Sequence, residues 1–248
     1  MQGLHTTIHQ GGQVQELSPG AWRLSLPPGG DAQYCLAQLD DYRTPHGFHL
    51  QWRPPVRLAL EARVSSAGLP GTWGFGFWNE PLGVSLFTRP LRVPALPQAV
   101  WFFQASAENF LALRDDHVAN GFMAAVFSSL RLPALLLLPG LPFVPLLAWP
   151  LAARRLRQAA RLLVRDEAAR VETDPCAWHA YAVEWLPDEV RLELDGETCF
   201  HSRCSPAGRL GAVIWIDNQY AAFPPSGRIR MGSLAMGAEH WMEVRHIR

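Results

Sequence analysis

The most chemically suggestive stretch of this sequence is LGAVIWIDNQY, residues 210–220. As a strand it places Trp215 and Asp217 on the same face, because successive side chains of a strand point to opposite faces. Sugar sites are built in this way: a flat ring stacks against the apolar face of a pyranose, while acids and amides bind its hydroxyls. The alternative is structural, with Trp215 in the core and Asp217 in an ordinary strand-end turn.

Tryptophan is frequent, at 10 of 248 residues, and several tryptophans fall on predicted strands. A wide sheet lined with such rings would hold an extended ligand, although large rings also fill the cores of β-sandwiches. In one aromatic strand Gly74 and Gly76 share a face, which indicates a bend or the close approach of another group to the backbone. The side chains that we expect to bind a ligand are Trp78, Trp101, Trp215, Asp217, Asn218 and Tyr220.

The elements that must position these residues are organised around WHAYAVEWLPDEVRLELDGE, residues 178–197. Aromatic and β-branched types crowd 178–185, apolar and charged residues alternate over 190–194, and the sequences LPD and DG that follow these runs are typical of tight turns. The pattern predicts an antiparallel meander. Further strands are expected at 21–26, 33–39, 48–52, 56–64, 71–80 and 99–106.

The same hairpin carries a resemblance to a known family. Its pattern WHxYxxEWxPD, closing on DG, resembles the second half of glycoside hydrolase family 16. Residues 71–78, GTWGFGFW, resemble the family's Gly-x-Trp-x-x-x-x-Trp strand, and residues 240–247, HWMEVRHI, resemble its closing strand. The resemblance implies an all-β, two-sheet antiparallel jelly-roll sandwich of the concanavalin A-like type.

The family's catalytic pattern has no counterpart here. Catalytic members carry Glu-x-Asp-x-(x)-Glu on the strand after the tryptophan-rich one, because retaining chemistry needs two carboxyl groups roughly 5 Å apart. The corresponding stretch, AVWFFQAS at 99–106, has no carboxylate. We therefore expect a carbohydrate- or glycolipid-binding protein without the paired catalytic acids. The alternative enzyme is a hydrolase of O-glycosyl bonds with acids relocated to Glu80, Glu108 or Asp217, which would have to converge within about 10 Å.

Residues 130–172 fit a jelly roll least, and we expect them to form an insertion within a single domain of residues 1–248. Residues 132–153 carry no charge, but their prolines argue against a straight membrane-spanning helix. An amphipathic helix with a basic face is predicted at 151–171. An apolar wedge beside an arginine-lined helix suits an anionic membrane surface. Membrane contacts are expected from Leu136, Phe143, Trp149, Arg154, Arg155 and Arg161.

Three other roles for the insertion stay open: a lid over the sheet, a homodimer contact, or the cover of a site for an apolar ligand. Formal net charge is zero and all 22 basic residues are arginine, which argues against nucleic-acid binding and excludes lysine chemistry. Four cysteines without a C-x-x-C pair and scattered histidines predict no metal site, and no cofactor is expected. Because no secretory signal is recognisable, we expect a cytoplasmic protein, free or peripherally attached to a membrane.

Overall fold

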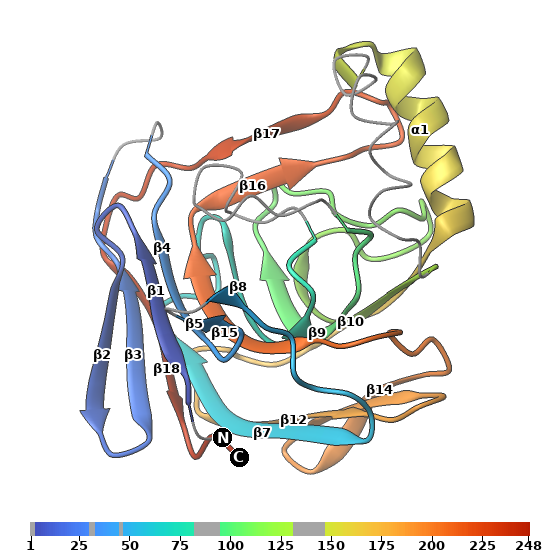
Figure 1. The fold of residues 1–248 in the computed structure, drawn as a ribbon. Coiled ribbons are helices and arrows are strands. Elements are labelled where there is room, and N and C mark those ends of the chain that lie inside the picture. The colour runs from blue at the N-terminus through green and yellow to red at the C-terminus, as the bar shows by residue number, and fades with distance from the viewer. Residues whose placement is uncertain (1–2, 30–32, 45–46, 82–94, 131–146) are drawn as a thin grey trace.

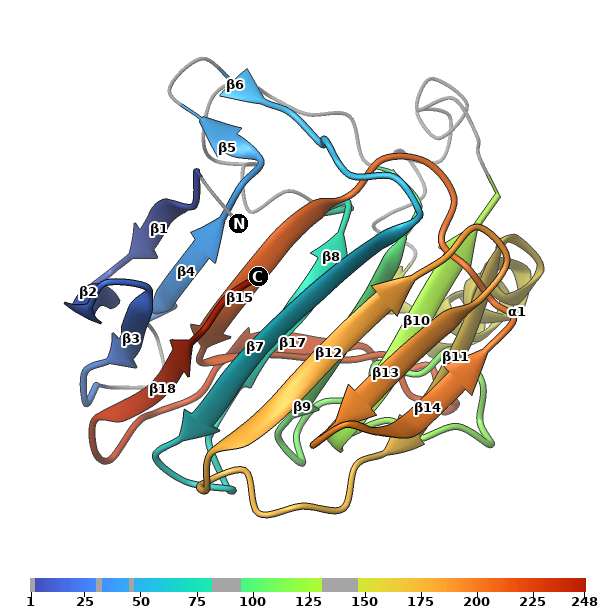
Figure 2. The same ribbon diagram turned by 90° about the horizontal axis from the view of Figure 1, so that it is seen from below.

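In a computed structural model of the chain, which describes residues 3–29, 33–44, 47–81, 95–130 and 147–248, two seven-stranded antiparallel sheets pack face to face (Figures 1 and 2). The strands of sheet A are, in spatial order, β1 (His5–His9), β4 (Leu36–Asp40), β15 (Gly211–Asp217), β8 (Thr72–Trp78), β9 (Ala99–Ala105), β10 (Gly121–Ser129) and β11 (Val164–Arg170). The strands of sheet B are β14 (Glu197–Ser202), β13 (Val190–Leu194), β12 (His179–Trp185), β7 (Val56–Val64), β18 (His240–Arg245), β3 (Ala21–Leu26) and β2 (Gln13–Ser18). The expected all-β, two-sheet sandwich is confirmed.

The core lies between the sheets and is filled by alternate side chains of both. On β8, Trp73, Phe75 and Phe77 are at most 1% exposed and point toward sheet B. Phe75 meets Tyr181 with ring centroids 5.1 Å apart, and Phe77 meets Trp185 at 6.0 Å. Burying each such aromatic side chain contributes roughly 2–3 kcal/mol, so these inter-sheet pairs fix how the two layers stack.

The predicted meander forms β12, β13 and β14. The turn between β13 and β14 is made by Asp195 and Gly196, both with positive φ (51° and 86°). Two consecutive positive φ values are what a two-residue type I′ hairpin needs, and they match the right-handed twist of the flanking strands. The tight turn predicted from the DG sequence is therefore confirmed, and it has the positive φ that the glycine was expected to supply.

Elements outside the sandwich cover the outer face of sheet A, meaning the face turned away from sheet B (Figure 1). They are the hairpin of β16 (Gln219–Ala222) and β17 (Arg230–Ser233), the helix α1 (Pro150–Leu163), and the loop of residues 106–120, here called the roof loop. A further small hairpin joins β5 (Arg43–Thr44) and β6 (Gly47–Phe48), where a strand over 48–52 had been predicted. None of the described helices is long and apolar enough to cross a membrane.

The helix predicted over 151–171 is wrong in its second part. The helix ends at Leu163, and the next residues form β11, which pairs antiparallel with β10. Without β11, β10 would present a row of unpaired N–H and C=O groups at the sheet edge, so sheet hydrogen bonding overrides a weak helical propensity here. The sequence VRDEAAR also has period-two burial, with Val164 and Asp166 buried. Residues 164–170, which were assigned to the predicted insertion, are thus part of sheet A.

The predicted basic face of this helix does not face solvent as a whole. Arg157 is only 8% exposed and points into the protein, whereas Leu151 and Leu162 are 75% and 81% exposed. The inward orientation of Arg157 arises because it binds the roof loop: Nη1 donates to the Ala112 carbonyl at 2.9 Å and Nη2 contacts Asp115 at 2.7 Å. The helix therefore turns apolar side chains outward.

Candidate functional site

The outer face of sheet A brings together three tryptophans that are far apart in the sequence. Trp215 on β15, Trp78 on β8 and Trp101 on β9 have ring centroids 5.3–6.0 Å from one another, and the rings of Trp78 and Trp215 are parallel to within 4°. The pairing registers of the three strands bring these tryptophans together. Val213, Gly76 and Trp101 form one row across the sheet, and Trp215 and Trp78 lie in the rows on either side.

Glycines beneath the rings make this stacking feasible. A Cβ atom on Gly74 would lie 2.7 Å from Cη2 of Trp215, and one on Gly76 would lie 2.6 Å from the Cβ of Trp101. Real Cβ atoms do not approach other atoms this closely, so any other residue would displace the rings or the neighbouring strand. The closest groups at these two glycines are the Phe102 and Val100 carbonyls of β9, at 2.4 and 2.3 Å from such a Cβ, and the ring of Trp215 follows at Gly74.

A cavity of about 420 Å³ lies between this aromatic floor and the covering elements. The roof loop contributes Leu111 and Val118, and β16 and the residues after it contribute Ala221 and Phe223. Most of the lining is apolar. The floor is made by Leu36, Trp78, Trp101, Phe103, Met123, Phe127 and Trp215. A covered, mainly apolar cavity with a few polar groups is the usual form of a small-molecule site.

One group of polar side chains in the cavity surrounds Asp217, and the carboxylates of Asp166 and Glu167 line the cavity as well. Thr72 Oγ1 donates to Asp217 Oδ1 at 2.7 Å and accepts from Trp215 Nε1 at 3.0 Å, while the backbone N–H of Gln219 donates to the same carboxylate oxygen at 3.2 Å. Burial raises the pKa of Asp217 to about 7, and the hydrogen bonds from Thr72, Gln219 and the Tyr34 hydroxyl oppose that rise. Burial, followed by the charge of Asp217, raises the pKa of Tyr34 in turn, so Tyr34 stays a donor. The carboxyl group of Asp217 therefore keeps its proton to a higher pH than an exposed aspartate does.

Two other tryptophan N–H groups differ in their hydrogen bonding. Trp78 Nε1 donates to the Tyr42 hydroxyl at 2.7 Å. Trp101 Nε1 is buried and has no acceptor within the described part of the chain. An unpaired buried donor costs about 1–3 kcal/mol. Trp101 is thus the ring of the cluster with an unused donor.

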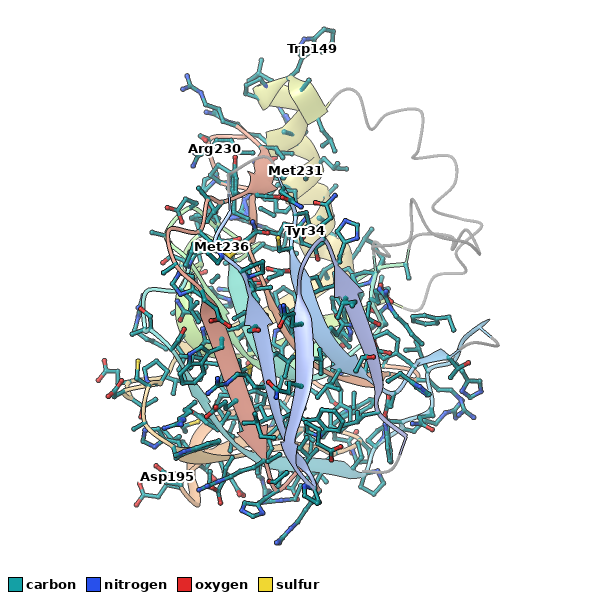
Figure 3. All side chains as sticks on the ribbon, turned by 90° about the vertical axis from the view of Figure 1, so that its left-hand side faces the viewer. Tyr34, Trp149, Asp195, Arg230, Met231 and Met236 are labelled. Atoms are coloured by element: carbon teal, nitrogen blue, oxygen red, sulfur yellow. The ribbon has the colours of Figure 1, made fainter. Side chains whose placement is uncertain are left out.

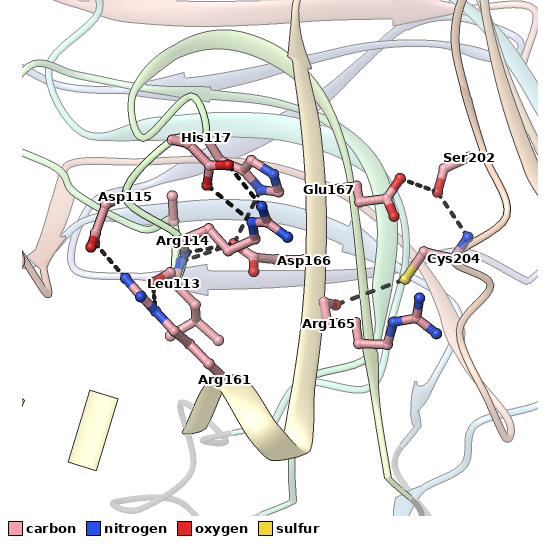
Figure 4. A network of polar contacts seen from close by, with 12 residues as sticks. Leu113, Arg114, Asp115, His117, Arg161, Arg165, Asp166, Glu167, Ser202 and Cys204 are labelled. Carbon is pink, nitrogen blue, oxygen red and sulfur yellow. Dashed lines mark hydrogen bonds and ion pairs between the residues drawn. The ribbon is translucent and has the colours of Figure 1, made fainter. Parts of the chain in front are cut away.

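The roof loop is held over the cavity by a polar network (Figure 4). Asp166 on β11 is 5% exposed and accepts from the backbone N–H groups of Leu113 and Arg114 at 2.9 and 3.5 Å. From α1, Arg161 donates to the Leu113 carbonyl at 2.7 Å and pairs with Asp115. The loop is therefore fastened both to the sheet edge and to the helix.

Solved structures with the same arrangement share little sequence with this chain. The κ-carrageenase from Pseudoalteromonas carrageenovora, in complex with an oligotetrasaccharide of κ-carrageenan, aligns over 98% of this chain and 87% of its own with a TM-score of 0.51 and 10% identity. A glycoside hydrolase family 16 endo-glucanase from Bacteroides ovatus aligns over 99% and 94% with a TM-score of 0.50 and 8% identity. The chain has the jelly-roll fold of family 16.

A third structure, the GlcNAcα1-4Gal-releasing endo-β-galactosidase from Clostridium perfringens, aligns over 96% of this chain with a TM-score of 0.49 and 10% identity. The present chain spans only 58% of the length of that enzyme. No protein-family model and no curated sequence matches this chain. The likeness therefore concerns the family 16 fold and extends to no activity.

On this family 16 fold, β9 is the strand that follows the tryptophan-rich one. Its residues that face the cavity side are Trp101, Phe103 and Ala105, since Val100 and Phe102 point into the core between the sheets. The positions i, i+2 and i+4 on this face thus carry two aromatic rings and a methyl group.

The three relocated acids do not meet in the cavity. Of Glu80, Glu108 and Asp217, only Asp217 is among the described residues that line it. Glu80 is 2% exposed and forms a buried ion pair with Arg43, and Glu108 is exposed in the roof loop. The paired geometry that hydrolysis requires is therefore not assembled from these three residues.

Two predicted ligand-binding residues serve the framework. Asn218 is fully buried: its Oδ1 accepts from the Cys35 N–H at 2.8 Å, and its Nδ2 donates to the carbonyls of Gln33 and Leu234, each at 2.8 Å. Both N–H donors of its amide are used, and the side chain is not exposed to the cavity. Tyr220 alternates with cavity-lining neighbours on β16 and packs beside Gly232 on β17, away from the cavity.

Sequence reasoning missed Tyr34, Thr72 and Phe103, which all line the cavity. Phe103 could have been predicted from the sequence, because it is two residues from Trp101 on the same predicted strand and so shares its face. Thr72 and Tyr34 carry no such local signal. Thr72 meets Asp217 through the register of β8 with β15, a pairing between residues 145 positions apart.

The described residues among those predicted to contact a membrane lie on α1 or directly before it. Trp149 precedes the helix and is 68% exposed, and Arg155 is exposed. Arg154 donates to the Ser226 carbonyl at 2.9 Å, and Arg161 is occupied by the roof loop. Leu136 and Phe143 lie outside the described residues. Among the described residues no group of three or more His, Cys, Asp or Glu side chains could hold a metal ion.

Proposed function

We propose that this protein binds a glycolipid-type ligand, a carbohydrate joined to an apolar group, in the cavity on the outer face of sheet A, and does not hydrolyse it. The observation that carries the proposal is the aromatic floor. Where family 16 chemistry needs carboxylates, β9 offers Trp101 and Phe103 to a covered cavity. Such a surface favours stacking over acid–base catalysis.

The two ends of the proposed ligand match two kinds of lining. A sugar ring would stack on Trp101, and Asp217 and Tyr34 would bind its hydroxyls. The aliphatic and aromatic remainder of the lining offers no hydrogen bonds and suits an apolar tail. Because glycolipids reside in membranes, we propose that the protein works at a membrane surface.

A hydrolase is the second candidate, and one observation favours it. A buried carboxyl group with a pKa of about 7 is suited to act as a general acid, as in many glycosidases, and Asp217 is such a group. A glycosidase also requires a second carboxylate at a defined separation. Asp166 and Glu167 line the cavity as well, but Asp166 accepts from backbone N–H groups of the roof loop and Glu167 accepts from the Ser202 hydroxyl. Binding without turnover therefore has the stronger support.

Isothermal titration calorimetry with three probes tests the binding function: dodecyl maltoside below its micellar concentration, maltose, and dodecanol. Dodecyl maltoside should bind more tightly than either fragment, because only it fills both parts of the cavity. Trp101→Ala should weaken it about tenfold through lost stacking and burial. Trp178→Ala, which removes a ring beside Arg63 and Arg245 of sheet B, is the matched control and should bind normally.

Equal affinity of the Trp101→Ala variant and the unmodified protein would contradict the cavity assignment. Release of dodecanol from dodecyl maltoside on prolonged incubation, abolished by Asp217→Asn, would instead support the hydrolase. Preference for dodecanol alone would point to a purely apolar ligand.

A further inference from the structure

We infer that a basic, apolar rim above the cavity docks on the surface of an anionic phospholipid bilayer. The rim consists of the exposed side chains Trp149, Leu151, Arg155, Arg228, Arg230 and Met231. They come from two segments that touch, since Arg154 of α1 donates to the Ser226 carbonyl ahead of β17. This inference goes beyond the proposed ligand, because it concerns lipid headgroups that the cavity does not bind.

The charge of the rim is of one sign. Residues 147–165 contain five arginines and residues 218–238 contain two, and neither segment contains an aspartate or glutamate. Arg157 and Arg161 share the carboxylate of Asp115 of the roof loop. The rim arginines, by contrast, are exposed and form no ion pair with any described residue. A cluster of exposed, unpaired arginines in a chain of zero net charge is complementary to anionic lipid headgroups.

The rim also exposes apolar side chains, which a charge-only surface would not need. Leu151 is 75% exposed, Trp149 68% and Met231 59%. Leu151 and Arg155 are one helical turn apart and therefore share a face. Tryptophan and arginine side chains beside exposed leucine and methionine are the usual composition of surfaces that insert into the headgroup layer.

The position of the rim suits a membrane-resident ligand. Figure 3 shows Trp149, Arg230 and Met231 at one end of the molecule and Asp195 at the other. Met231 also lines the cavity, so the exposed rim and the apolar interior are continuous at this side chain. A bilayer lying against the rim would be next to the cavity, whereas sheet B would face away from it.

Co-sedimentation of the full chain with vesicles tests the inference. Vesicles of phosphatidylcholine alone are compared with vesicles of phosphatidylcholine and phosphatidylglycerol, neither containing a glycolipid. The protein should bind the anionic vesicles and be released by high salt. The variant R155Q/R228Q/R230Q should bind them roughly a hundredfold more weakly, at about fivefold per arginine near the surface. W149S/L151S should also weaken binding, with salt dependence retained.

The variant R53Q/R191Q/R209Q is the matched control, because it changes net charge equally and its residues are exposed outside α1, β16 and β17. It should bind as the unmodified protein does. Equal loss in both triple variants, or no binding to anionic vesicles by the unmodified protein, would overturn the inference. So would a dimer that W149S/L151S converts to a monomer without any vesicle binding, since the rim would then be covered by a second copy. None of these outcomes bears on calorimetric binding of dodecyl maltoside.

Discussion

At the scale of single residues, Asp217 combines burial with the most developed hydrogen-bond network of the cavity. Its raised pKa means that the folded protein holds a proton that the unfolded chain, with an ordinary carboxyl pKa of 3.8, releases first. The resulting contribution to the free energy of unfolding is fully present below about pH 4 and is lost as pH rises through about 7. Asp217 thus couples the stability of the protein to the protonation state of its cavity.

The prediction is that the unmodified protein loses stability relative to Asp217→Asn as pH rises from about 4 to about 8, by at most about 4 kcal/mol. Urea unfolding of both proteins across this range measures it. The other carboxyl groups, such as Asp195 with its pKa lowered by His179, are common to both proteins and cancel in the difference. A difference that does not change with pH would show that Asp217 is ionised throughout.

The sequence predicted the three cavity tryptophans because aromatic residues on strands have a strong local signature, and the pairing registers then placed them together. It did not predict that the Asn218 amide forms hydrogen bonds with three backbone groups. Those groups belong to residues 33, 35 and 234, which are distant from Asn218 in the sequence. The chemistry of a side chain is readable from its type, but its remaining hydrogen-bonding capacity depends on neighbours brought by the fold.

At the scale of elements, the helix α1 is attached to the roof loop by two arginines, and Arg157 is the buried one. The Arg157 guanidinium is buried, binds the Ala112 carbonyl and Asp115, and lies 5.5 Å from the ring centre of Phe110. Replacing it by methionine keeps the bulk but leaves the Ala112 carbonyl without its donor. We expect a cost of about 1–3 kcal/mol, concentrated in the loop and helix rather than in the sandwich.

Amide hydrogen exchange measures this effect. In Arg157→Met, residues 110–118 should exchange faster, whereas β8 and β9 should keep their protection. Arg155→Met is the control, since Arg155 is exposed on the same helix and should leave exchange in the loop unchanged. Uniformly faster exchange across both sheets would mean that Arg157 supports the whole fold and not a local attachment.

Strands with a clear sequence signal of their own were predicted well. Strands whose conformation depends on pairing with a neighbouring strand were not. The strands β3, β7 and β13 match the predicted ranges, since each is a run of β-formers bounded by turn residues. The strand β10 went unpredicted, and β11 was assigned to a helix, because VRDEAAR has little strand propensity of its own. Its conformation is decided by the open edge of β10, which no local pattern reveals.

At the scale of the whole molecule, the two faces of sheet A belong to two different apolar clusters. Its inner face packs against sheet B, and its outer face forms a second apolar cluster under the covering elements. The sandwich architecture followed from local strand and turn signals together with the family resemblance. The second cluster did not, because it depends on segments near residues 36, 78, 101, 123 and 215 meeting across five strands.

The close packing of the tryptophan cluster has a spectroscopic consequence. Indole rings with centroids 5.3–6.0 Å apart, fixed at 4° to 48°, do not absorb independently. Their transition dipoles couple, so the cluster should give a paired positive and negative band in circular dichroism whose sign depends on the handedness of the ring arrangement. Any molecule that parts the rings would reduce this couplet, so the protein carries its own optical reporter of occupancy.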